Sequence, residues 1–299
     1  MSDKNGIIIL NKEAGMTSQT AVNKVKRLFG ADKAGHTGTL DPMATGVLPV
    51  LINRGVKAGE YMLCSEKHYL AECVLGITTD TEDTSGKILT ECENIPDEAE
   101  VLSVCERFKG EIMQIPPMYS AIRVNGTRLM EMARRGETVE REARPITIYS
   151  LDAKRIEENK YSLDIECSKG TYIRTVCADI GKALGCGGTM SALCRLEAAG
   201  FTLEEAHTLS ELEAMSESER DALIVPVEKI FEKYPVFDLP PFYASLAHNG
   251  ACIYRKKCAF DLQLGTYVRL YDKEGFFALG EVIEENGELA VKPQKQFRL

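Results

Sequence analysis

The chain has 299 residues, and 44% of them are hydrophobic, which is enough to build the core of one large or two ordinary globular domains. The longest uncharged run, from Pro42 to Asn53, is too short to cross a bilayer, and the first residues lack the apolar run of a signal peptide. We therefore expect a cytoplasmic protein without a membrane partner. The 10 cysteines include no C-x-x-C pair and are accompanied by only 4 histidines, which predicts reduced thiols and no metal site.

The charge of the chain is unevenly distributed. A formal net charge of -9 argues against a nucleic-acid partner, because phosphate binding relies on Lys and Arg. Residues 78–106 and 197–232, however, together hold 19 acids and 3 bases. The rest of the chain holds 26 acids and 33 bases, so a basic surface for RNA remains compatible with the composition.

The N-terminal elements are predicted to be a short buried strand over residues 6–10 and a helix that starts after Thr17 or Ser18 and stops at Gly30. Lys12 lies in the turn between them. The basic residues of this helix either give the next loop a positive rim or form an ordinary solvated face, and the pattern leaves both interpretations open.

Residues 35–49 follow, with the sequence Gly-His-Thr-Gly-Thr-Leu-Asp-Pro-Met-Ala-Thr-Gly-Val-Leu-Pro. The glycines and prolines disfavour a helix or strand and favour a loop of fixed shape. Its single acid, Asp41, precedes Pro42, which biases Asp41 toward extended backbone. A carboxylate held in this way is a candidate nucleophile, base or metal ligand, whereas the alternative is an Asx turn in which Asp41 only caps its own loop.

The next predicted strand begins near Tyr69, where apolar and polar residues alternate. The Tyr69 ring is either a core residue or a surface for stacking. The oxygen-rich residues 78–86 lack the acid spacing and the terminal glutamate of a calcium loop, so we predict no metal there. An acidic helix is predicted over residues 96–109.

Arginines mark the middle of the chain. Those from Arg123 to Arg144 are candidates for phosphate contact, although a mixed-charge surface helix would give the same pattern. Residues 161–167 predict a strand that turns at residues 168–170 into a helix, which places Arg174 at a strand-to-helix corner. Beyond a proline-rich link near residues 234–241, the tail reads as three short strands.

Several of these segments resemble the motifs of one family. Residues 35–42 resemble the G-H-T-G-x-L-D-P signature of the TruB family of tRNA pseudouridine-55 synthases. Residues 12–18 resemble K-P-x-G-x-T-S, with Glu13 in place of the proline. Residues 78–86 resemble T-D-T-x-D-x-x-G, and residues 116–129 resemble P-P-x-Y-S-A-x-K-V-N-G-x-R-L. Residues 169–174 resemble K-G-T-Y-I-R, and residues 191–196 resemble a motif that contains a leucine. The tail resembles a PUA domain, the RNA-binding appendage common in this family.

The resemblance implies an α+β fold in two domains. Residues 1–234 would form a mixed α/β pseudouridine synthase catalytic domain with a central, mainly antiparallel sheet. Residues 235–299 would form a small β-rich, PUA-like RNA-binding domain. Its candidate phosphate contacts are Arg255, Lys256 and Lys257.

The resemblance also implies roles for individual residues. Asp41 would be the catalytic nucleophile, Arg174 its basic partner, and Tyr69 the ring that stacks on the target base and a candidate for removing the C5 proton. An arginine beside Asp41 is expected to lower the pKa of that carboxyl. The residues implied in substrate binding are His36, Lys12, Leu193 and Tyr172. The reaction is redox-neutral, so neither a cofactor nor a metal is expected.

The implied function is the isomerisation of uridine-55 in the tRNA T loop to pseudouridine, by a base-flipping enzyme that binds the tRNA T-arm as a monomer without a required protein partner. Two alternatives stay open. One is a non-catalytic RNA-binding or tRNA-folding protein on the same scaffold. The other is a guide-RNA-dependent pseudouridine synthase. Activity of the purified chain on bare transcript would distinguish them.

Overall fold

The computed structural model describes residues 4–62 and 66–298. Within them, one large sheet has the strand order β1-β3-β12-β4-β11-β10-β7, with β2 beside β3 and β13 beside β12. The strands are β1 (Gly6–Lys12), β2 (Ala34–His36), β3 (Thr45–Ile52), β4 (Lys67–Leu75), β7 (Gly110–Gln114), β10 (Arg144–Glu157), β11 (Lys160–Cys167), β12 (Gly188–Ala198) and β13 (Phe201–Thr202). Every pair except β3 with β12 is antiparallel, which confirms the predicted mainly antiparallel sheet.

The helices begin and end close to the predicted signals. Helix α1 starts at Ser18 because the Thr17 side chain caps it, accepting a hydrogen bond from the Thr20 N–H. The α-helices are α1 (Ser18–Leu28), α2 (Gly59–Met62), α3 (Glu98–Glu106), α4 (Leu129–Arg134), α5 (Ile173–Ala183), α6 (Leu209–Ala214), α7 (Glu217–Ala222) and α8 (Pro241–His248). The 3₁₀ helices are η1 (Asn53–Ala58), η2 (Leu203–Glu205) and η3 (Val227–Phe231). No helix among the described residues is long and apolar enough to span a membrane.

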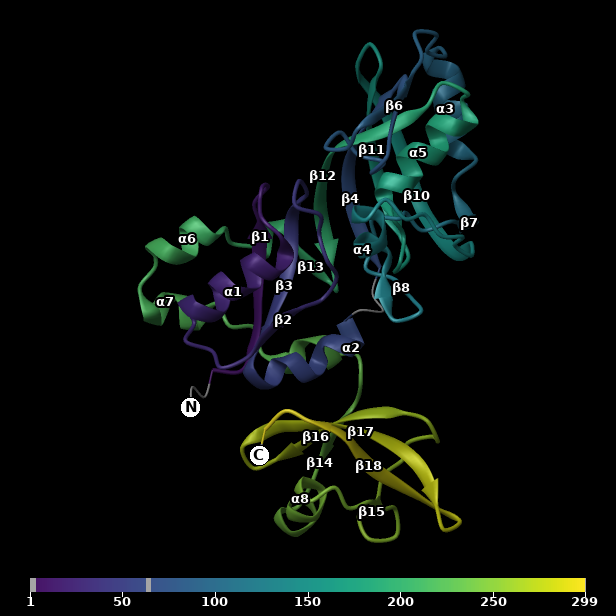
Figure 1. The fold of residues 1–299 in the computed structure, drawn as a ribbon. Coiled ribbons are helices and arrows are strands. Elements are labelled where there is room, and N and C mark those ends of the chain that lie inside the picture. Colours follow the sequence, from purple (N-terminus) through teal and green to yellow (C-terminus); the bar gives the residue numbers. More distant parts are fainter. Residues whose placement is uncertain (1–3, 63–65, 299) are drawn as a thin grey trace.

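Strand β12 joins the two halves of the large sheet (Figure 1). On one side it pairs with β4 from Gly188 to Ala198, whereas on the other it pairs with β3 only at Cys194 and Arg195. One half therefore contains β1, β2 and β3, and the other contains β4, β11, β10 and β7. Figure 1 shows α1 against the first half and α5 against the second.

Gly46 makes the β3–β12 junction possible. Its φ of +100° is left-handed, and a Cβ at this position would lie 2.7 Å from the Arg195 backbone nitrogen and closer still to the Arg195 carbonyl oxygen. Real side chains do not tolerate such contacts, so the two strands can approach here only because residue 46 is glycine.

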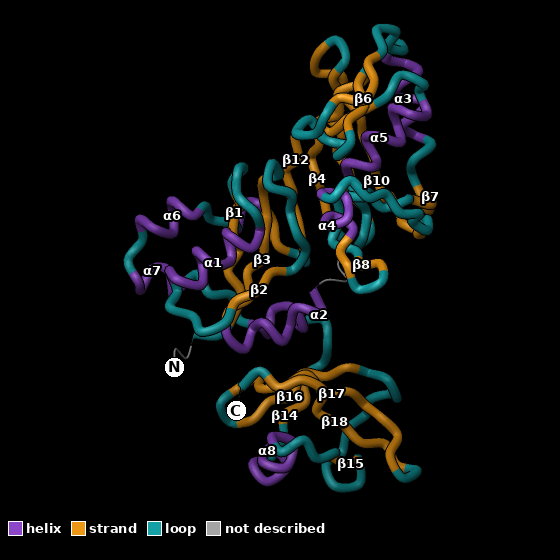
Figure 2. Tube along the Cα trace, in the orientation of Figure 1, coloured by secondary structure: helices purple, strands orange, loops and turns teal. Residues whose placement is uncertain are grey.

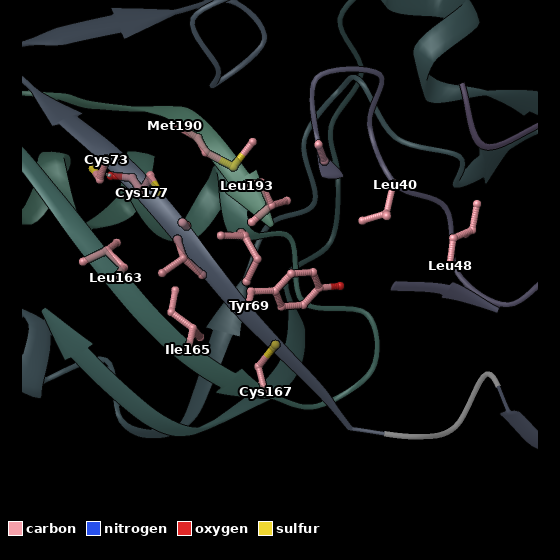
Figure 3. Close-up of a cluster of buried hydrophobic side chains, with 14 of the residues drawn as sticks. Leu40, Leu48, Tyr69, Cys73, Leu163, Ile165, Cys167, Cys177, Met190 and Leu193 are labelled. Atoms are coloured by element: carbon pink, nitrogen blue, oxygen red, sulfur yellow. Dashed lines mark hydrogen bonds between the residues drawn. The ribbon is translucent and has the colours of Figure 1, made fainter. Parts of the chain in front are cut away.

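The core of the second half lies between β4, β11, β12 and α5 (Figure 3). Tyr69, Leu163, Cys177 and Met190 are all buried there. The cysteines within residues 4–62 and 66–298 are free thiols, whereas Cys64 lies outside the described residues. Two small hairpins project from this half: β5 (Ile77–Thr79) with β6 (Ile88–Glu91), and β8 (Arg123–Val124) with β9 (Thr127–Arg128).

A second sheet follows at the C-terminus, in the order β14-β16-β17-β18-β15. Its strands are β14 (Val236–Asp238), β15 (Ile253–Tyr254), β16 (Tyr267–Asp272), β17 (Gly275–Glu285) and β18 (Glu288–Gln296). The three strands predicted in the tail correspond to β16, β17 and β18, so a β-rich C-terminal unit is confirmed. The exact domain boundary at residues 234 and 235 stays a prediction.

An aromatic cluster joins the second sheet to the first part of the chain. The Phe231 ring in η3 lies at its centre, 5.2 Å from Tyr61, 5.4 Å from Phe297 and 6.0 Å from Phe276, measured between ring centroids. A salt bridge of 2.6 Å between Lys295 and Glu60 crosses the same boundary. The two units are therefore packed against each other and not merely tethered.

Candidate active site

The Asp41 loop links β2 to β3 (Figure 2), and hydrogen bonds to residues 15 and 18 hold its backbone. The Ser18 hydroxyl donates to the Leu40 carbonyl at 3.0 Å and accepts from the Leu40 N–H at 2.9 Å. Leu40 itself is buried, and the Pro42 carbonyl accepts from the Gly15 N–H at 2.8 Å. These contacts fix the backbone on both sides of Asp41, whose side chain remains 33% exposed.

Arg174 holds the Asp41 carboxylate at two points. Its Nε lies 2.9 Å from Asp41 Oδ2, and its Nη2 donates to Asp41 Oδ1 at 3.3 Å. The same guanidinium donates to the carbonyls of Tyr119, at 2.8 Å, and Thr81, at 3.0 Å. Because Arg174 is only 6% exposed and also fixed by backbone groups, it orients the carboxylate and does not merely neutralise it.

The pKa of Asp41 shifts in the opposite direction to the one expected from sequence. Burial raises it above its ordinary value, and this effect exceeds the lowering by Arg174 and Lys12. The neighbouring carboxylate of Asp83 acts in the same direction as burial. The expectation of a lowered pKa was wrong because it counted the ion pair and not the loss of hydration.

Asp83 is a site residue that the sequence analysis did not single out. Its Oδ2 lies 3.6 Å from Arg174 Nη1, on the far side of the guanidinium from Asp41. Its Oδ1 accepts from the Thr81 hydroxyl at 2.8 Å and from the Ser85 N–H at 3.0 Å. The signal was present in the T-D-T-x-D-x-x-G similarity of residues 78–86, but that similarity gave no role to its second aspartate.

A pocket of about 330 Å³ opens above the Asp41–Arg174 pair. Its lining brings together five residues named from sequence: Asp41, Tyr69, Tyr172, Arg174 and Leu193. In Figure 3 the Tyr69 ring extends from β4 with its hydroxyl toward the loop that carries Leu40, and Leu193 lies near the ring. Burial raises the pKa of the Tyr69 phenol, partly offset by the Arg195 guanidinium.

Tyr172 is fixed through its backbone by Gln114. The Gln114 side chain accepts from the Tyr172 N–H at 2.9 Å and donates to the Tyr172 carbonyl at 3.1 Å. Gln114 is 2% exposed, so its own side of both contacts is shielded from water. This clamp sets where the strand-to-helix corner presents Tyr172 to the pocket.

Lys12 and His36 lie outside the pocket lining. The Lys12 ammonium is fully buried and donates to the carbonyls of Glu13, Pro42 and Ala44, and burial lowers its pKa to about 8. Lys12 therefore binds the backbone of the Asp41 loop from its buried side. This position gives no geometric support to the predicted contact between Lys12 and the substrate. His36 ends β2, burial lowers its pKa, and its Nδ1 has no hydrogen-bond partner in the described part of the chain.

Arg195 is the second residue that the sequence analysis missed. It is 1% exposed, donates to the carbonyls of Val47, at 2.7 Å, and Gly38, at 3.1 Å, and lines the pocket beside Tyr69. It thus ties β12 to the start of the Asp41 loop at Gly38 and to β3 at Val47. Among residues 4–62 and 66–298, no group of three or more His, Cys, Asp and Glu side chains is arranged to hold a metal ion.

Comparison with solved structures supports the same architecture. The chain is similar to the structure of a Cbf5-Nop10-Gar1 complex, with a TM-score of 0.73 and 27% identity over 98% of this chain and 85% of that one. It is also similar to the archaeal box H/ACA sRNP Nop10-Cbf5 complex, with a TM-score of 0.71 and 26% identity over 98% of this chain and 86% of that one. The predicted fold class is thereby confirmed.

Comparison of sequences assigns the family. Residues 26–173 match the model of the TruB family pseudouridylate synthase N-terminal domain, and residues 174–232 match that of the tRNA pseudouridylate synthase B C-terminal domain. The tRNA pseudouridine synthase B of Francisella tularensis subsp. novicida is 42% identical over 93% of this chain and 91% of its own length. That of Francisella philomiragia subsp. philomiragia is 41% identical over 96% of this chain and 94% of its own length. The chain therefore belongs to the TruB family of pseudouridine synthases, which are isomerases.

Proposed function

We propose that this chain isomerises uridine-55 in the T loop of tRNA to pseudouridine, with Asp41 as the nucleophile. The observation that carries the proposal is the two-point pair between Asp41 and Arg174 in a pocket that Tyr69 and Leu193 also line. The relatives named tRNA pseudouridine synthase B support tRNA as the substrate class. They do not favour a non-catalytic or guide-RNA-dependent protein.

The reaction breaks the bond between N1 of uracil and C1′ of the ribose, and forms a bond between C5 and C1′. C5 loses a proton and N1 gains one, so no electrons are exchanged with a cofactor. In this proposal an Asp41 oxygen attacks the uracil ring or C1′, and Arg174 keeps both carboxylate oxygens in a fixed orientation toward the pocket. The same arrangement serves either point of attack.

The target base must leave the RNA stack before it can reach Asp41, which costs a few kcal/mol. Tyr69 offers an aromatic face for the flipped base, and Leu193 offers an apolar surface nearby. The Tyr69 hydroxyl is our candidate for taking the C5 proton, and Tyr172 is a further contact for the base. His36, which ends β2 just before the Asp41 loop, is proposed to fill the space that the base leaves in the RNA.

The C-terminal unit, residues 235–299, is proposed to be a PUA-like domain that binds RNA. Arg255, Lys256 and Lys257 are exposed there and suit phosphate contact. The solved relatives contain Cbf5 together with Nop10 and Gar1 or with Nop10 alone. For this chain we propose a monomer that needs no such partner and acts in the cytoplasm.

Tritium release from C5-labelled uridine in an unmodified tRNA transcript tests the proposal. Wild-type protein alone should release tritium, and replacing the T-loop uridine with cytidine should abolish the release. Asp41→Asn should lower the rate on the order of 10³-fold or more, because the nucleophile is lost, with tRNA affinity within a few fold of wild type. An active Asp41→Asn variant would exclude Asp41 as the nucleophile.

A further inference from the structure

Glu82 occupies a strained position next to the Arg174 network. It lies in the loop between β5 and β6 with a φ of 64°, in the left-handed region that long side chains rarely adopt. Its N–H donates to the Thr79 carbonyl at 3.4 Å, and its carbonyl accepts from the Met190 N–H of β12 at 3.1 Å. The surrounding structure thus holds the Glu82 backbone and fixes the direction of its side chain.

The Glu82 side chain points to the start of α5. Its carboxylate accepts a hydrogen bond from the Thr175 hydroxyl at 2.5 Å, and Thr175 is buried in the first turn, directly after Arg174. The N-cap residue of α5 is Tyr172, whose phenol is not a helix-capping group, and the first turn of α5 contains no acid. Because helix N-termini favour negative charge, Glu82 supplies from another segment the anion that the sequence of α5 lacks.

The same loop also contacts Arg174 directly. The Thr81 carbonyl accepts from Arg174 Nη1 at 3.0 Å, and Asp83 lies 3.6 Å from the same nitrogen. Residues 81, 82 and 83 therefore contact two consecutive residues of α5. The position of the Arg174 guanidinium relative to Asp41 depends on how this loop is seated on the helix.

We propose that Glu82 is a positioning residue for pseudouridine formation: its ionised carboxylate holds the first turn of α5 against the loop and so sets Arg174 between Asp83 and Asp41. Glu82 makes no contact with substrate in this role. The inference rests on the proposed function of the site and adds a residue whose loss would weaken catalysis without weakening RNA binding.

Three charged groups on two segments act on the Glu82 carboxyl, besides burial and the Thr175 hydrogen bond. Burial is the largest effect and raises its pKa, while the Thr175 hydrogen bond and Arg174 lower it. Asp179 of α5 raises the pKa further, and Arg141, between α4 and β10, lowers it; Asp83 is the adjacent acid in the same loop. Glu82 thus gains its proton at a higher pH than an ordinary glutamate, so the wild-type enzyme loses this anion as the pH falls.

The variant Glu82→Gln removes the charge and keeps the size and a carbonyl that can accept from Thr175. At pH 8 its single-turnover rate on tRNA transcript should be roughly tenfold below wild type, with the tRNA Kd unchanged. The ratio of the wild-type rate to the Glu82→Gln rate should fall toward one as the pH is lowered, because the Glu82 carboxylate of the wild type then also loses its charge. Equal rates at pH 8, or a ratio that is constant with pH as for a simple structural defect, would overturn the proposal.

A second pair of variants separates the effect of the Glu82 side chain from the effect of backbone strain. Glu82→Gly relieves the left-handed strain, so the loop should stay folded while the rate at pH 8 falls at least as far as in Glu82→Gln. Ala199→Gly is the matched control, since Ala199 has a φ of 57° in the turn between β12 and β13, and its rate should equal that of wild type. Full activity of Glu82→Gly would also overturn the positioning role.

The wild-type measurement keeps the two proposals apart. If wild-type protein forms no pseudouridine in the transcript, the proposed function fails and the role of Glu82 fails with it. If wild-type protein is active, Asp41→Asn is inactive and Glu82→Gln equals wild type, only the positioning role is overturned.

Discussion

Arg174 shows why the identity of a single residue matters in this site. Its guanidinium contacts two carboxylates, Asp41 and Asp83, and the carbonyls of Tyr119 and Thr81. A planar group with five N–H donors can satisfy all of these partners at once, whereas a lysine ammonium has only three donors and no fixed plane. The orientation of the Asp41 carboxylate, our proposed nucleophile, is therefore set by a residue that need not itself react.

Tyr69→Phe tests the role of the phenol. The ring remains, so the fold and the tRNA affinity should be preserved, but the rate of tritium release from C5 should fall roughly 10²-fold if the hydroxyl removes that proton. Single-turnover assays on labelled transcript measure the effect. Tyr161→Phe is a matched control because Tyr161 is equally buried in β11 but does not line the pocket. An undiminished rate in Tyr69→Phe would show that the hydroxyl is dispensable.

The sequence was informative about residues that occur in recognisable motifs. Asp41, Tyr69, Tyr172, Arg174 and Leu193 were all named in advance, and the pocket lining contains all five. Their catalytic and binding roles stay predictions. The raised pKa of Asp41 could not be predicted, because it depends on burial, which is a property of the folded chain.

Strand β12 shows the limit of pattern analysis at the level of elements. Residues 191–196 were noted only as a motif, yet they belong to an eleven-residue strand that pairs on both sides. By contrast, α1, α3 and β11 lie within a few residues of their predicted bounds, because caps and regular apolar spacing mark them locally. Which strands become neighbours is decided by distant segments, and for that the family resemblance was needed.

Gly46→Ala tests the β3–β12 junction. A methyl group there would collide with the Arg195 backbone and would occupy a left-handed φ, so the free energy of unfolding should fall by at least about 2 kcal/mol. Activity should fall too, because Arg195 and the Asp41 loop would shift together. Urea unfolding measures the loss. Gly200→Ala, also at positive φ but with open space around its Cβ, should cost only about 1 kcal/mol, and an equal cost for both would contradict the steric argument.

Asp272 links β16 to α8 and to the C-terminal residues. Burial acts to raise its pKa, but hydrogen bonds from Arg298, His248 and the Glu274 N–H outweigh burial and lower the pKa to about 2. A lowered carboxyl pKa stabilises the fold through the ionised form, so this contribution is complete above the ordinary value of 3.8 and is lost as the pH falls from 3.8 to about 2.

Asp272→Asn should therefore be less stable than wild type at pH 6, and the difference should narrow at pH 3. Chemical unfolding at the two pH values measures it. A difference that stays constant between pH 6 and pH 3 would mean that ionisation of Asp272 does not contribute to stability.

At the scale of the whole molecule, the two units share one aromatic cluster. Phe231 is 1% exposed and contacts rings from both sides of the boundary. A flexible linker alone would let the units move independently, whereas a buried shared ring couples their positions. We therefore expect the C-terminal unit to present the surface proposed to bind RNA at a fixed angle to the pocket.

Phe231→Ala should uncouple the two units. Loss of this buried ring should cost about 3–5 kcal/mol, and calorimetry should resolve two unfolding transitions where the wild type has one. Phe242→Ala, which removes a ring that is 68% exposed on α8, should change stability by less than about 0.5 kcal/mol. If Phe231→Ala unfolds in a single transition and is as stable as the wild type, the cluster does not hold the units together.

The wide separation of the site residues along the chain has a consequence for the time at which the site forms. Asp41 and Arg174 are 133 residues apart, and Gly38 and Arg195 are 157 apart. A ribosome that adds roughly 5–20 residues per second needs on the order of ten seconds to pass from Asp41 to β12. For most of that interval the nascent chain carries Asp41 without Arg174, and Arg195 is added only within β12 itself. The Asp41 carboxylate therefore gains its two-point partner, and the pocket its last lining residues, only when the large sheet is nearly complete.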